Sequence, residues 1–202
     1  MRESIPIVLS YLLGSIPFGF IVAFVVKGID IRNFGSGNIG ATNVFRVVGK
    51  AWGIAVFLLD FVKGFLPPFL VARFFNTGHP QGYLILACAV LAIIGHNWPV
   101  FLRFKGGKGV ATSVGVIFGL GFVFSHLWLI LGLSLLVFVV TFLIFRYVSL
   151  ASMVSAVAFV VFSFVFKVSG EIKFFSFLLL AFIILRHKKN IKNILAKKEY
   201  KF

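Results

Sequence analysis

The stretch HLWLILGLSLLVFVVTFLIF, residues 126–145, decides the fold class of this chain. It contains no Lys, Arg, Asp or Glu, and its length matches the roughly 20 apolar residues that a bilayer-spanning helix needs. Similar runs fill most of the 202 residues, of which 60% are apolar and 12% are charged, and the mean hydropathy is +1.09. This composition excludes a water-soluble globule and predicts an all-α, polytopic membrane helix bundle.

Breaks at charge and glycine clusters divide the chain into seven expected spans. They are residues 5–26, 51–75, 82–101, 109–124, 126–145, 148–166 and 173–186. The run from 109 to 145 is too long for one span but is only weakly divided, so five spans is the alternative. Little sequence remains for a water-exposed domain, and we expect one integral-membrane domain over residues 1–202. We expect the first span to be retained, because no small-x-small cleavage site follows it.

The charge distribution orients the expected bundle. Twenty Lys and Arg against five Asp and Glu give a net charge of +15, which favours anionic lipids or anionic substrates as partners. So apolar a chain is not typical of nucleic-acid-binding proteins. With seven spans and the N-terminus outside, fifteen cations share one face, Lys63 lies inside a span, and four (Arg2, Arg73, Lys167 and Lys173) lie opposite. The positive-inside rule then predicts that the fifteen, the glycine-rich loops and the C-terminus are cytoplasmic.

Two features inside the expected spans have structural interpretations. Asp60 and Lys63 lie three residues apart on one helical face, so we expect them to neutralise one another, with a catalytic role as the alternative. Two pairs of small residues fit close helix packing. These pairs are Gly49 with Gly53 and Gly115 with Gly119.

The first polar segment is GSGNIGATNVFR, residues 35–46. Three of its glycines match the bare dinucleotide-binding pattern, but that fingerprint needs a preceding strand in a βαβ unit, and here an apolar span precedes it. The segment can still bind an anion through its own backbone and side chains. Glycines let backbone N–H groups turn toward one anion, Ser36 and Thr42 add hydroxyl donors, and Arg46 adds a bidentate charge. The segment therefore predicts a phosphate cradle.

The second polar segment is GHNWPVFLRFKGGKGVAT, residues 95–112. A Walker loop is excluded, since that pattern needs Gly at Leu102 and a hydroxyl at Gly109. A helix beginning near Gly109 would still direct its N-terminal dipole at an anion, with Lys108 as a point charge. A basic loop that touches lipid phosphates is the alternative, although it does not explain the spacing Lys-Gly-Gly-Lys-Gly.

The third polar segment is RHKKNIKNIL, residues 186–195. Its composition favours a polybasic juxtamembrane helix that binds anionic lipid. Alternatively, His187 and Asn190, which share one helical face, point together at a substrate. A smaller element, RYVSLAS at residues 146–152, places an arginine and two hydroxyls on the same membrane face.

Several catalytic devices are missing from the sequence. It has no pair of loop carboxylates, no Cys or His cluster at metal-binding spacing, and no nucleophile elbow. We therefore expect no metal site and no cofactor. The remaining route to catalysis is positioning plus electrostatic stabilisation by N–H groups, Lys, Arg and hydroxyls.

The three segments, in this order, resemble the bacterial acyl-phosphate:glycerol-3-phosphate acyltransferases, the PlsY family. The likeness runs through nearly the whole chain. The tail departs at residues 196–199, AKKE, where the family often has Gly before its acid, so the resemblance assigns no role to Glu199.

The resemblance implies a multi-pass enzyme of the bacterial inner membrane. It would move a fatty acyl group from acyl phosphate to the 1-hydroxyl of sn-glycerol 3-phosphate, giving lysophosphatidate and phosphate, the first acylation of phospholipid synthesis. The implied partners are these two substrates, the bilayer lipids and the enzyme that makes acyl phosphate.

The residues that match the family's motifs form the expected site. The expected catalytic residues are Ser36, Arg46, Lys108 and His187. The expected substrate-binding residues are Gly35, Gly37, Asn38, Gly40, Thr42, Asn43, His96, Asn97, Lys105, Gly106, Gly107, Gly109, Thr112, Ser152 and Asn190. The hydroxyl and amide side chains of the first segment, with Lys108, would hold the acyl-phosphate head, while Arg46, His187 and Asn190 would bind glycerol 3-phosphate. An oxygen of a substrate phosphate is the expected proton acceptor, with His187 as the alternative.

Two other functions stay open from the residues alone. One is a small transporter or channel for an organic phosphate anion, although no internal repeat duplicates the glycine-rich segments, as such folds tend to show. The other is an acyltransferase that uses a thioester donor.

Overall fold

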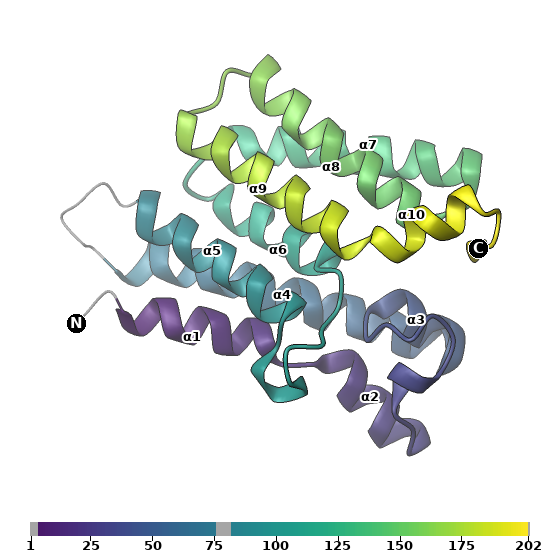
Figure 1. Ribbon diagram of the computed structural model, residues 1–202. Coiled ribbons are helices and arrows are strands. Elements are labelled where there is room, and N and C mark those ends of the chain that lie inside the picture. The colour runs from purple at the N-terminus through teal and green to yellow at the C-terminus, as the bar shows by residue number, and fades with distance from the viewer. Residues whose placement is uncertain (1–3, 76–81, 202) are drawn as a thin grey trace. The chain divides into compact units, whose positions relative to one another are not determined.

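The computed structural model describes residues 4–75 and 82–201, and every regular element in these ranges is helical (Figure 1). The elements are α1 (Ser4–Ser15), α2 (Phe18–Lys27), η1 (Ile31–Asn33), α3 (Ala41–Val47), α4 (Lys50–Phe74), α5 (Gly82–Asn97), η2 (Val100–Leu102), α6 (Val110–Leu120), α7 (His126–Phe145), α8 (Val148–Val165), α9 (Gly170–Arg186) and α10 (Lys188–Leu195). The all-α prediction is confirmed. Arg2, one of the cations predicted to lie outside, is not among the described residues.

Five stretches of the described residues are long and apolar enough to cross a bilayer. They are Ser4–Lys27, Lys50–Phe74, Gly82–Leu102, His126–Phe145 and Val148–Val165. The other two expected spans form shorter helices, α6 with 11 residues and α9 with 17. At the helical rise these are about 16 and 26 Å long, less than the roughly 30 Å of a typical hydrocarbon core. Length and composition thus support five of the seven expected spans.

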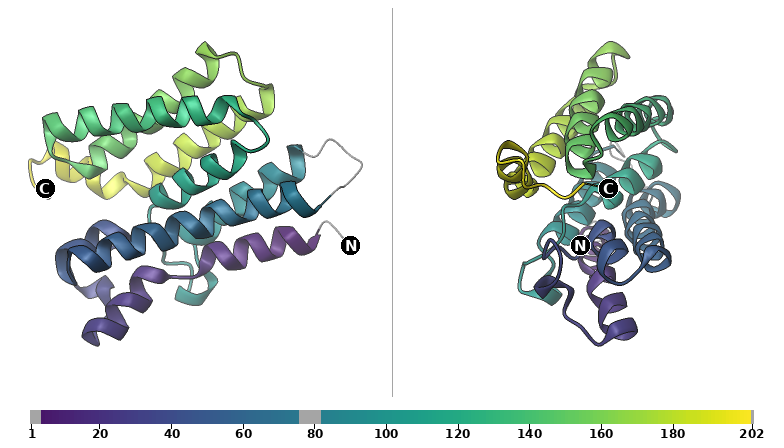
Figure 2. Two further views of the ribbon diagram at one scale, coloured as in Figure 1. Left: turned by 180° about the vertical axis from the view of Figure 1, so that it is seen from behind. Right: turned by 90° about the vertical axis from the view of Figure 1, so that its right-hand side faces the viewer.

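The first expected span, residues 5–26, lies within the apolar stretch Ser4–Lys27 but consists of two helices. α1 ends at Ser15 and α2 begins at Phe18, with a short non-helical link between them (Figures 1 and 2). Pro17 has no N–H to continue the helix and disfavours the α conformation of Ile16. The carbonyl oxygen of Ile16 instead accepts from Lys63 Nζ at 2.7 Å.

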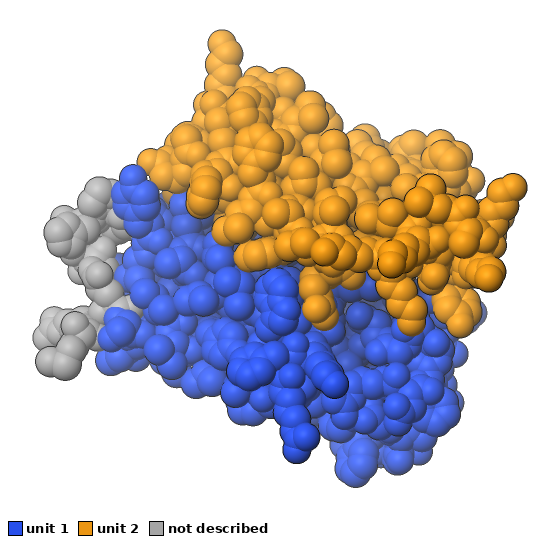
Figure 3. Space-filling model, viewed as in Figure 1, with its two compact units in different colours: residues 1–123 blue, residues 124–202 orange. Residues whose placement is uncertain are grey.

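The described chain forms two compact units, Met1–Val123 and Phe124–Phe202 (Figure 3). In the first unit α4 packs along α6, and α1 packs along α5. In the second unit α8 contacts both α7 and α9. Large apolar side chains along α7 are exposed, which suits a surface that faces lipid; they include Leu136, Val139, Leu143 and Ile144.

Glycines allow the close approach of helices in the first unit. A methyl group at Gly115 would collide with the Phe61 carbonyl oxygen of α4, and one at Gly53 would collide with Phe45 of α3. Gly119 likewise lies against α4. The packing prediction is confirmed for these three glycines and wrong for Gly49, where an added methyl group would meet no atom nearer than 3.9 Å and φ is +144°. Gly49 is needed for its backbone conformation, which L side chains rarely adopt.

Candidate functional site

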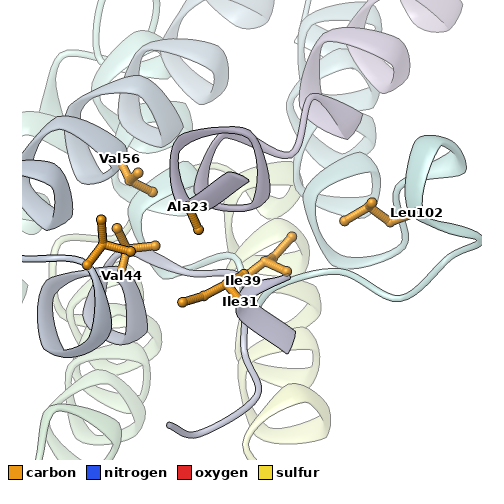
Figure 4. Packing of buried hydrophobic residues seen from close by; sticks show 7 residues of the cluster. Ala23, Ile31, Ile39, Val44, Val56 and Leu102 are labelled. Atoms are coloured by element: carbon orange, nitrogen blue, oxygen red, sulfur yellow. The ribbon is translucent and has the colours of Figure 1, made fainter. Parts of the chain in front are cut away.

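The first and second polar segments share one hydrophobic cluster in the first unit (Figure 4). Ile39 and Val44 come from the first segment, and Leu102 comes from the second. The other buried members lie in or next to α2, η1, α3 and α4: Ala23, Ile31, Val48 and Val56. Burial of these apolar side chains fixes both polar segments to a common core. The third polar segment belongs to the second unit.

Asn43 organises the first segment. Its Oδ1 accepts from the backbone N–H of Ser36 at 3.0 Å, and its Nδ2 donates to the carbonyl oxygens of Phe34 at 3.0 Å and Asn38 at 2.9 Å. The side chain is buried. The amide of Asn43 therefore holds the loop backbone together, and its contact with a substrate stays a prediction. Sequence reasoning missed this structural role, because a side chain's bonds to backbone groups seven and nine residues away leave no local pattern.

Backbone N–H groups of this loop bond internally. Besides Ser36, Gly37 N–H donates to the Phe34 carbonyl oxygen at 3.0 Å, and Gly40 N–H donates to Asn38 Oδ1 at 2.8 Å. In this structure two asparagine side chains and a carbonyl accept from these three N–H groups, and the expected contact of the segment's N–H groups with an anion stays a prediction. Ser36 and Thr42 are half-buried and Arg46 is exposed, and the contact of these side chains with a substrate stays a prediction.

An ion pair anchors the entry to this loop. The Asp30 carboxylate accepts from the Arg32 backbone N–H at 3.0 Å and pairs with the Arg32 guanidinium, whose Nη2 lies 2.6 Å from Oδ2. Hydrogen bonding by the guanidinium lowers the pKa of the Asp30 carboxyl and raises the pKa of Arg32. The guanidinium also lies 5.2 Å from the centre of the Phe20 ring. These contacts tie the turn after α2 to the helix itself.

The second segment leads into α6, which begins at Val110, close to the expected position. Gly109 precedes it with a φ of +77°, and a methyl group there would lie 2.7 Å from Asn97 Oδ1. The Asn97 amide therefore lies beside the residue that caps α6. Tyr11 of α1 holds the same segment by donating its hydroxyl to the Trp98 carbonyl oxygen at 2.9 Å.

Buried polar groups collect at this N-terminal end of α6. Both amide atoms of Asn97 and the hydroxyls of Thr112 and Ser113 are buried and have no hydrogen-bond partner within residues 4–75 and 82–201. Leaving such a group unsatisfied costs about 1–3 kcal/mol. Three together at a helix N-terminus, where the dipole favours negative charge, fit a site that receives an anion. Lys108 beside them is half-buried, whereas Lys105 is exposed.

Ser113 was not among the predicted residues. Its signal was its place next to Thr112 in the first turn of the expected helix, since both residues then lie near the free N–H groups of the helix.

The predicted pairing of Asp60 with Lys63 is confirmed. Lys63 Nζ lies 2.7 Å from Asp60 Oδ1 inside α4, and both side chains are buried. His96 at the end of α5 approaches the same oxygen, with Nδ1 at 3.6 Å. His96 was predicted to bind a substrate, and that contact stays a prediction.

The third segment orients two of its predicted residues through hydrogen bonds. His187 Nδ1 lies 2.8 Å from the Ile183 carbonyl oxygen. Because a carbonyl only accepts, Nδ1 carries the hydrogen, and Nε2 is the nitrogen that can exchange a proton. Asn190 Nδ2 donates to Glu199 Oε1 at 2.6 Å, and the Ser149 hydroxyl donates to the same oxygen at 2.8 Å.

Glu199 thus joins the tail to α8 and α10, a role that the sequence did not reveal because its partners lie 9 and 50 residues away. The hydroxyl of Ser152 donates to the Val148 carbonyl oxygen of its own helix at 2.8 Å, and its contact with a substrate stays a prediction. Within the described residues, no three His, Cys, Asp or Glu side chains are grouped so that they could hold a metal ion.

Known proteins match along the whole chain. A family model described as "Glycerol-3-phosphate acyltransferase" matches residues 4–197. Proteins of that name from Aquifex aeolicus (strain VF5) and from Wolbachia sp. subsp. Brugia malayi are 40% and 42% identical, each over 100% of both chains. Two crystal structures of PlsY, an integral membrane glycerol 3-phosphate acyltransferase, also match over 100% of this chain and 96% of theirs.

The glycerol 3-phosphate form of PlsY has a TM-score of 0.90 at 40% identity, and the lysophosphatidic acid form has a TM-score of 0.87 at 39% identity. Each of these likenesses covers both units of the chain. The chain therefore belongs to the glycerol-3-phosphate acyltransferase family of integral membrane enzymes.

Proposed function

We propose that this protein transfers a fatty acyl group from acyl phosphate to the 1-hydroxyl of sn-glycerol 3-phosphate, giving lysophosphatidate and phosphate. The acceptor and the product are those named for the two similar crystal structures. One observation supports acyl phosphate as the acyl donor. The buried, unsatisfied polar groups of Asn97, Thr112 and Ser113 lie at the N-terminal end of α6, beside Lys108. A phosphoryl group on the acyl donor would accept from Asn97 Nδ2 and from the Thr112 and Ser113 hydroxyls, whereas a thioester carries no anion next to its reacting carbonyl.

The reaction requires no covalent enzyme intermediate. The glycerol hydroxyl oxygen attacks the acyl carbon, the bond from that carbon to the phosphate oxygen breaks, and phosphate leaves. Lys108 and the N–H groups at the start of α6 would stabilise the charge on the leaving phosphate. The hydroxyl proton passes to an oxygen of a substrate phosphate, or alternatively to His187 Nε2.

The predicted residues have separate roles in this proposal. Ser36, Asn38 and Thr42 add donors for the acyl phosphate, and Arg46 binds the phosphate of the acceptor. Asn43 contributes through the loop that it holds. His187 and Asn190 bind glycerol 3-phosphate. This role is supported by the hydrogen bonds to the Ile183 carbonyl oxygen and to Glu199, which orient the two side chains.

We also propose that α6 and α9 cross the membrane with the five longer spans, as one seven-helix domain of the bacterial inner membrane with the N-terminus outside. The family match over residues 4–197 supports a single domain, and the fifteen-to-four division of cations supports this orientation. The test is labelling of single cysteines in intact cells, with Cys88 replaced by Ser. A membrane-impermeant maleimide should label Lys167→Cys and leave Arg103→Cys unlabelled, and the reverse pattern contradicts the orientation. A protein that makes acyl phosphate is the proposed partner.

A donor-swap assay on the purified protein tests the function. Labelled glycerol 3-phosphate is mixed with acyl phosphate, with acyl-coenzyme A or with acyl carrier protein of the same chain length, and lysophosphatidate is measured together with released phosphate. We expect lysophosphatidate and phosphate in equal amounts when acyl phosphate is the donor, and no lysophosphatidate with either thioester donor. Product formed from a thioester without phosphate release would refute the proposed donor. Uptake of glycerol 3-phosphate into proteoliposomes without any donor would favour transport.

A further inference from the structure

A buried network of charged and polar groups links α1 to α4. Lys63 Nζ lies 2.7 Å from Asp60 Oδ1, and the two side chains are 2% and 3% exposed. The same ammonium donates to the Ile16 carbonyl oxygen at 2.7 Å, at the break in the helix before Pro17. It also lies 5.5 Å from the centre of the Phe18 ring. The ammonium is therefore held from α4 and from the α1–α2 link together.

His96 extends this network to the glycine pair of the second segment. Its Nδ1 lies 3.6 Å from Asp60 Oδ1, and its Nε2 lies against Gly107, where an added methyl group would collide with the ring. The backbone N–H of Gly107 donates to the His96 carbonyl oxygen at 3.1 Å. A methyl group at Gly106 would strike that same carbonyl oxygen. The ring and backbone of His96 thus support the loop at residues 105–109.

Stability alone does not account for a charged pair at this place. A buried ion pair is often no more stabilising than well-packed apolar residues of similar volume. Asp60 Oδ1, at 3.6 Å from His96 Nδ1, is too far for a hydrogen bond, but its buried charge favours the ring orientation that keeps this nitrogen beside it. Asp60 could not do this unpaired, because an isolated charge within a membrane span is costly, and Lys63 supplies the compensating charge.

We propose that Asp60, Lys63 and His96 are positioning residues for acyl transfer. The buried carboxylate of the ion pair favours one orientation of the imidazole, the imidazole packs against Gly107, and Gly107 sets the position of Lys108 and of the start of α6. The inference rests on the proposed function, because it takes this loop as the site of the donor's phosphoryl group.

The test is a double-mutant cycle with separate KM values. The variant Asp60→Asn/Lys63→Met removes both charges together, so that no unpaired charge is left in the span. It is compared with wild type, with His96→Ala and with the triple variant, in the same detergent. The measured quantities are the KM for acyl phosphate, the KM for glycerol 3-phosphate, kcat and the melting temperature.

A positioning role predicts that the charge-free variant raises the KM for acyl phosphate about tenfold, since a small displacement of a binding group weakens its contacts. The KM for glycerol 3-phosphate should stay within about twofold. In the His96→Ala background the same double substitution should change the KM for acyl phosphate by less than about twofold, because the pair acts through that ring.

Other outcomes overturn the proposal. A lower melting temperature and a lower kcat with an unchanged KM for acyl phosphate would mean that the pair serves only stability. If the fold changes in the KM for acyl phosphate caused by the charge-free variant and by His96→Ala multiply in the triple variant, the pair does not act through the ring. If the charge-free variant does not fold, the test rests on His96→Gln. An unchanged KM for acyl phosphate in His96→Gln then refutes the proposal. Turnover of wild type with acyl phosphate is measured in the same assay. If wild type uses acyl phosphate, the proposed donor stands even when the positioning role fails.

Discussion

Asn43 and Ser36 lie seven residues apart and are joined by a hydrogen bond of 3.0 Å from the Ser36 backbone N–H to Asn43 Oδ1. The other end of the amide donates to the Phe34 and Asn38 carbonyl oxygens. The buried side chain of Asn43 therefore holds together the loop that carries the proposed catalytic hydroxyl of Ser36.

Replacing Asn43 by Asp should therefore be damaging, although the two side chains have nearly the same shape. The carboxylate can still accept from Ser36, but its second oxygen would face two carbonyl oxygens in place of a donor. We expect a loss of about 2 kcal/mol or more in stability, roughly 4–8 °C in Tm. Thermal unfolding in detergent measures it. Asn33→Asp, at an exposed position of η1, is the matched control, and equal losses in both variants would contradict the role of Asn43.

Lys108 is the cation that the proposed mechanism needs most. Charge-assisted hydrogen bonds contribute about 1.5–3 kcal/mol, so Lys108→Ala should lower turnover by one to two powers of ten or more. Steady-state kinetics with acyl phosphate measures the change. Lys50→Ala, at an exposed lysine of α4, should leave turnover near the wild-type value. Wild-type turnover in Lys108→Ala would remove Lys108 from the mechanism.

Helix positions could be predicted from the sequence because charge and glycine clusters interrupt long apolar runs. The break at Pro17 could not, since hydropathy counts a proline within an apolar run as part of it. Pro67 and Pro68 lie inside α4 without ending it. At the break the Leu13 carbonyl accepts from the Ile16 N–H, and the Ile16 carbonyl accepts from the Phe18 N–H and from Lys63 Nζ, 47 residues away, a partner that no local pattern reveals.

The residue types of the site were predictable, but their partners were less so. Glycines, hydroxyls and cations at short spacing indicated anion binding at the second segment, and the buried polar groups there support it. In the first segment the same reasoning assigned Gly37 and Gly40 N–H groups to an anion, whereas the loop uses them itself. Local spacing shows which donors exist, and the fold decides which of them are already occupied.

Gly107 should not tolerate a side chain. Gly107→Ala would place a methyl group against His96 Nε2, so the ring or the loop must move. We expect at least about a tenfold fall in kcat/KM for acyl phosphate, because the loop next to Lys108 is displaced. Gly132→Ala is the control: its methyl group would meet nothing within 4 Å, and alanine in a helix stabilises by about 0.5–1 kcal/mol. Full activity of Gly107→Ala would show that the contact with His96 is unimportant.

Acid should weaken the anchor between Asp30 and Arg32. The guanidinium holds the Asp30 pKa below its ordinary value of 3.8. A carboxyl whose pKa is lowered by folding stabilises the protein above its ordinary pKa, and this contribution is lost as the pH falls through the lowered value. Wild type should therefore melt above Asp30→Asn at pH 7, and the difference should persist down to the ordinary pKa of 3.8 and shrink as the pH falls below it. A difference that is independent of pH would contradict the ion pair.

Glu199 should stabilise the tail through its capacity to accept hydrogen bonds. Its Oε1 receives both the Asn190 amide and the Ser149 hydroxyl, so Glu199→Ala leaves two donors without their acceptor. We expect a loss of about 1–3 kcal/mol and lower activity, because Asn190 is no longer oriented. Glu199→Gln keeps an acceptor oxygen and should retain most of the stability, and Glu171→Ala serves as the control for removing an acid. Melting temperature and turnover are measured for all three. If Gln proves as damaging as Ala, the negative charge of Glu199 matters, and the hydrogen-bond explanation fails.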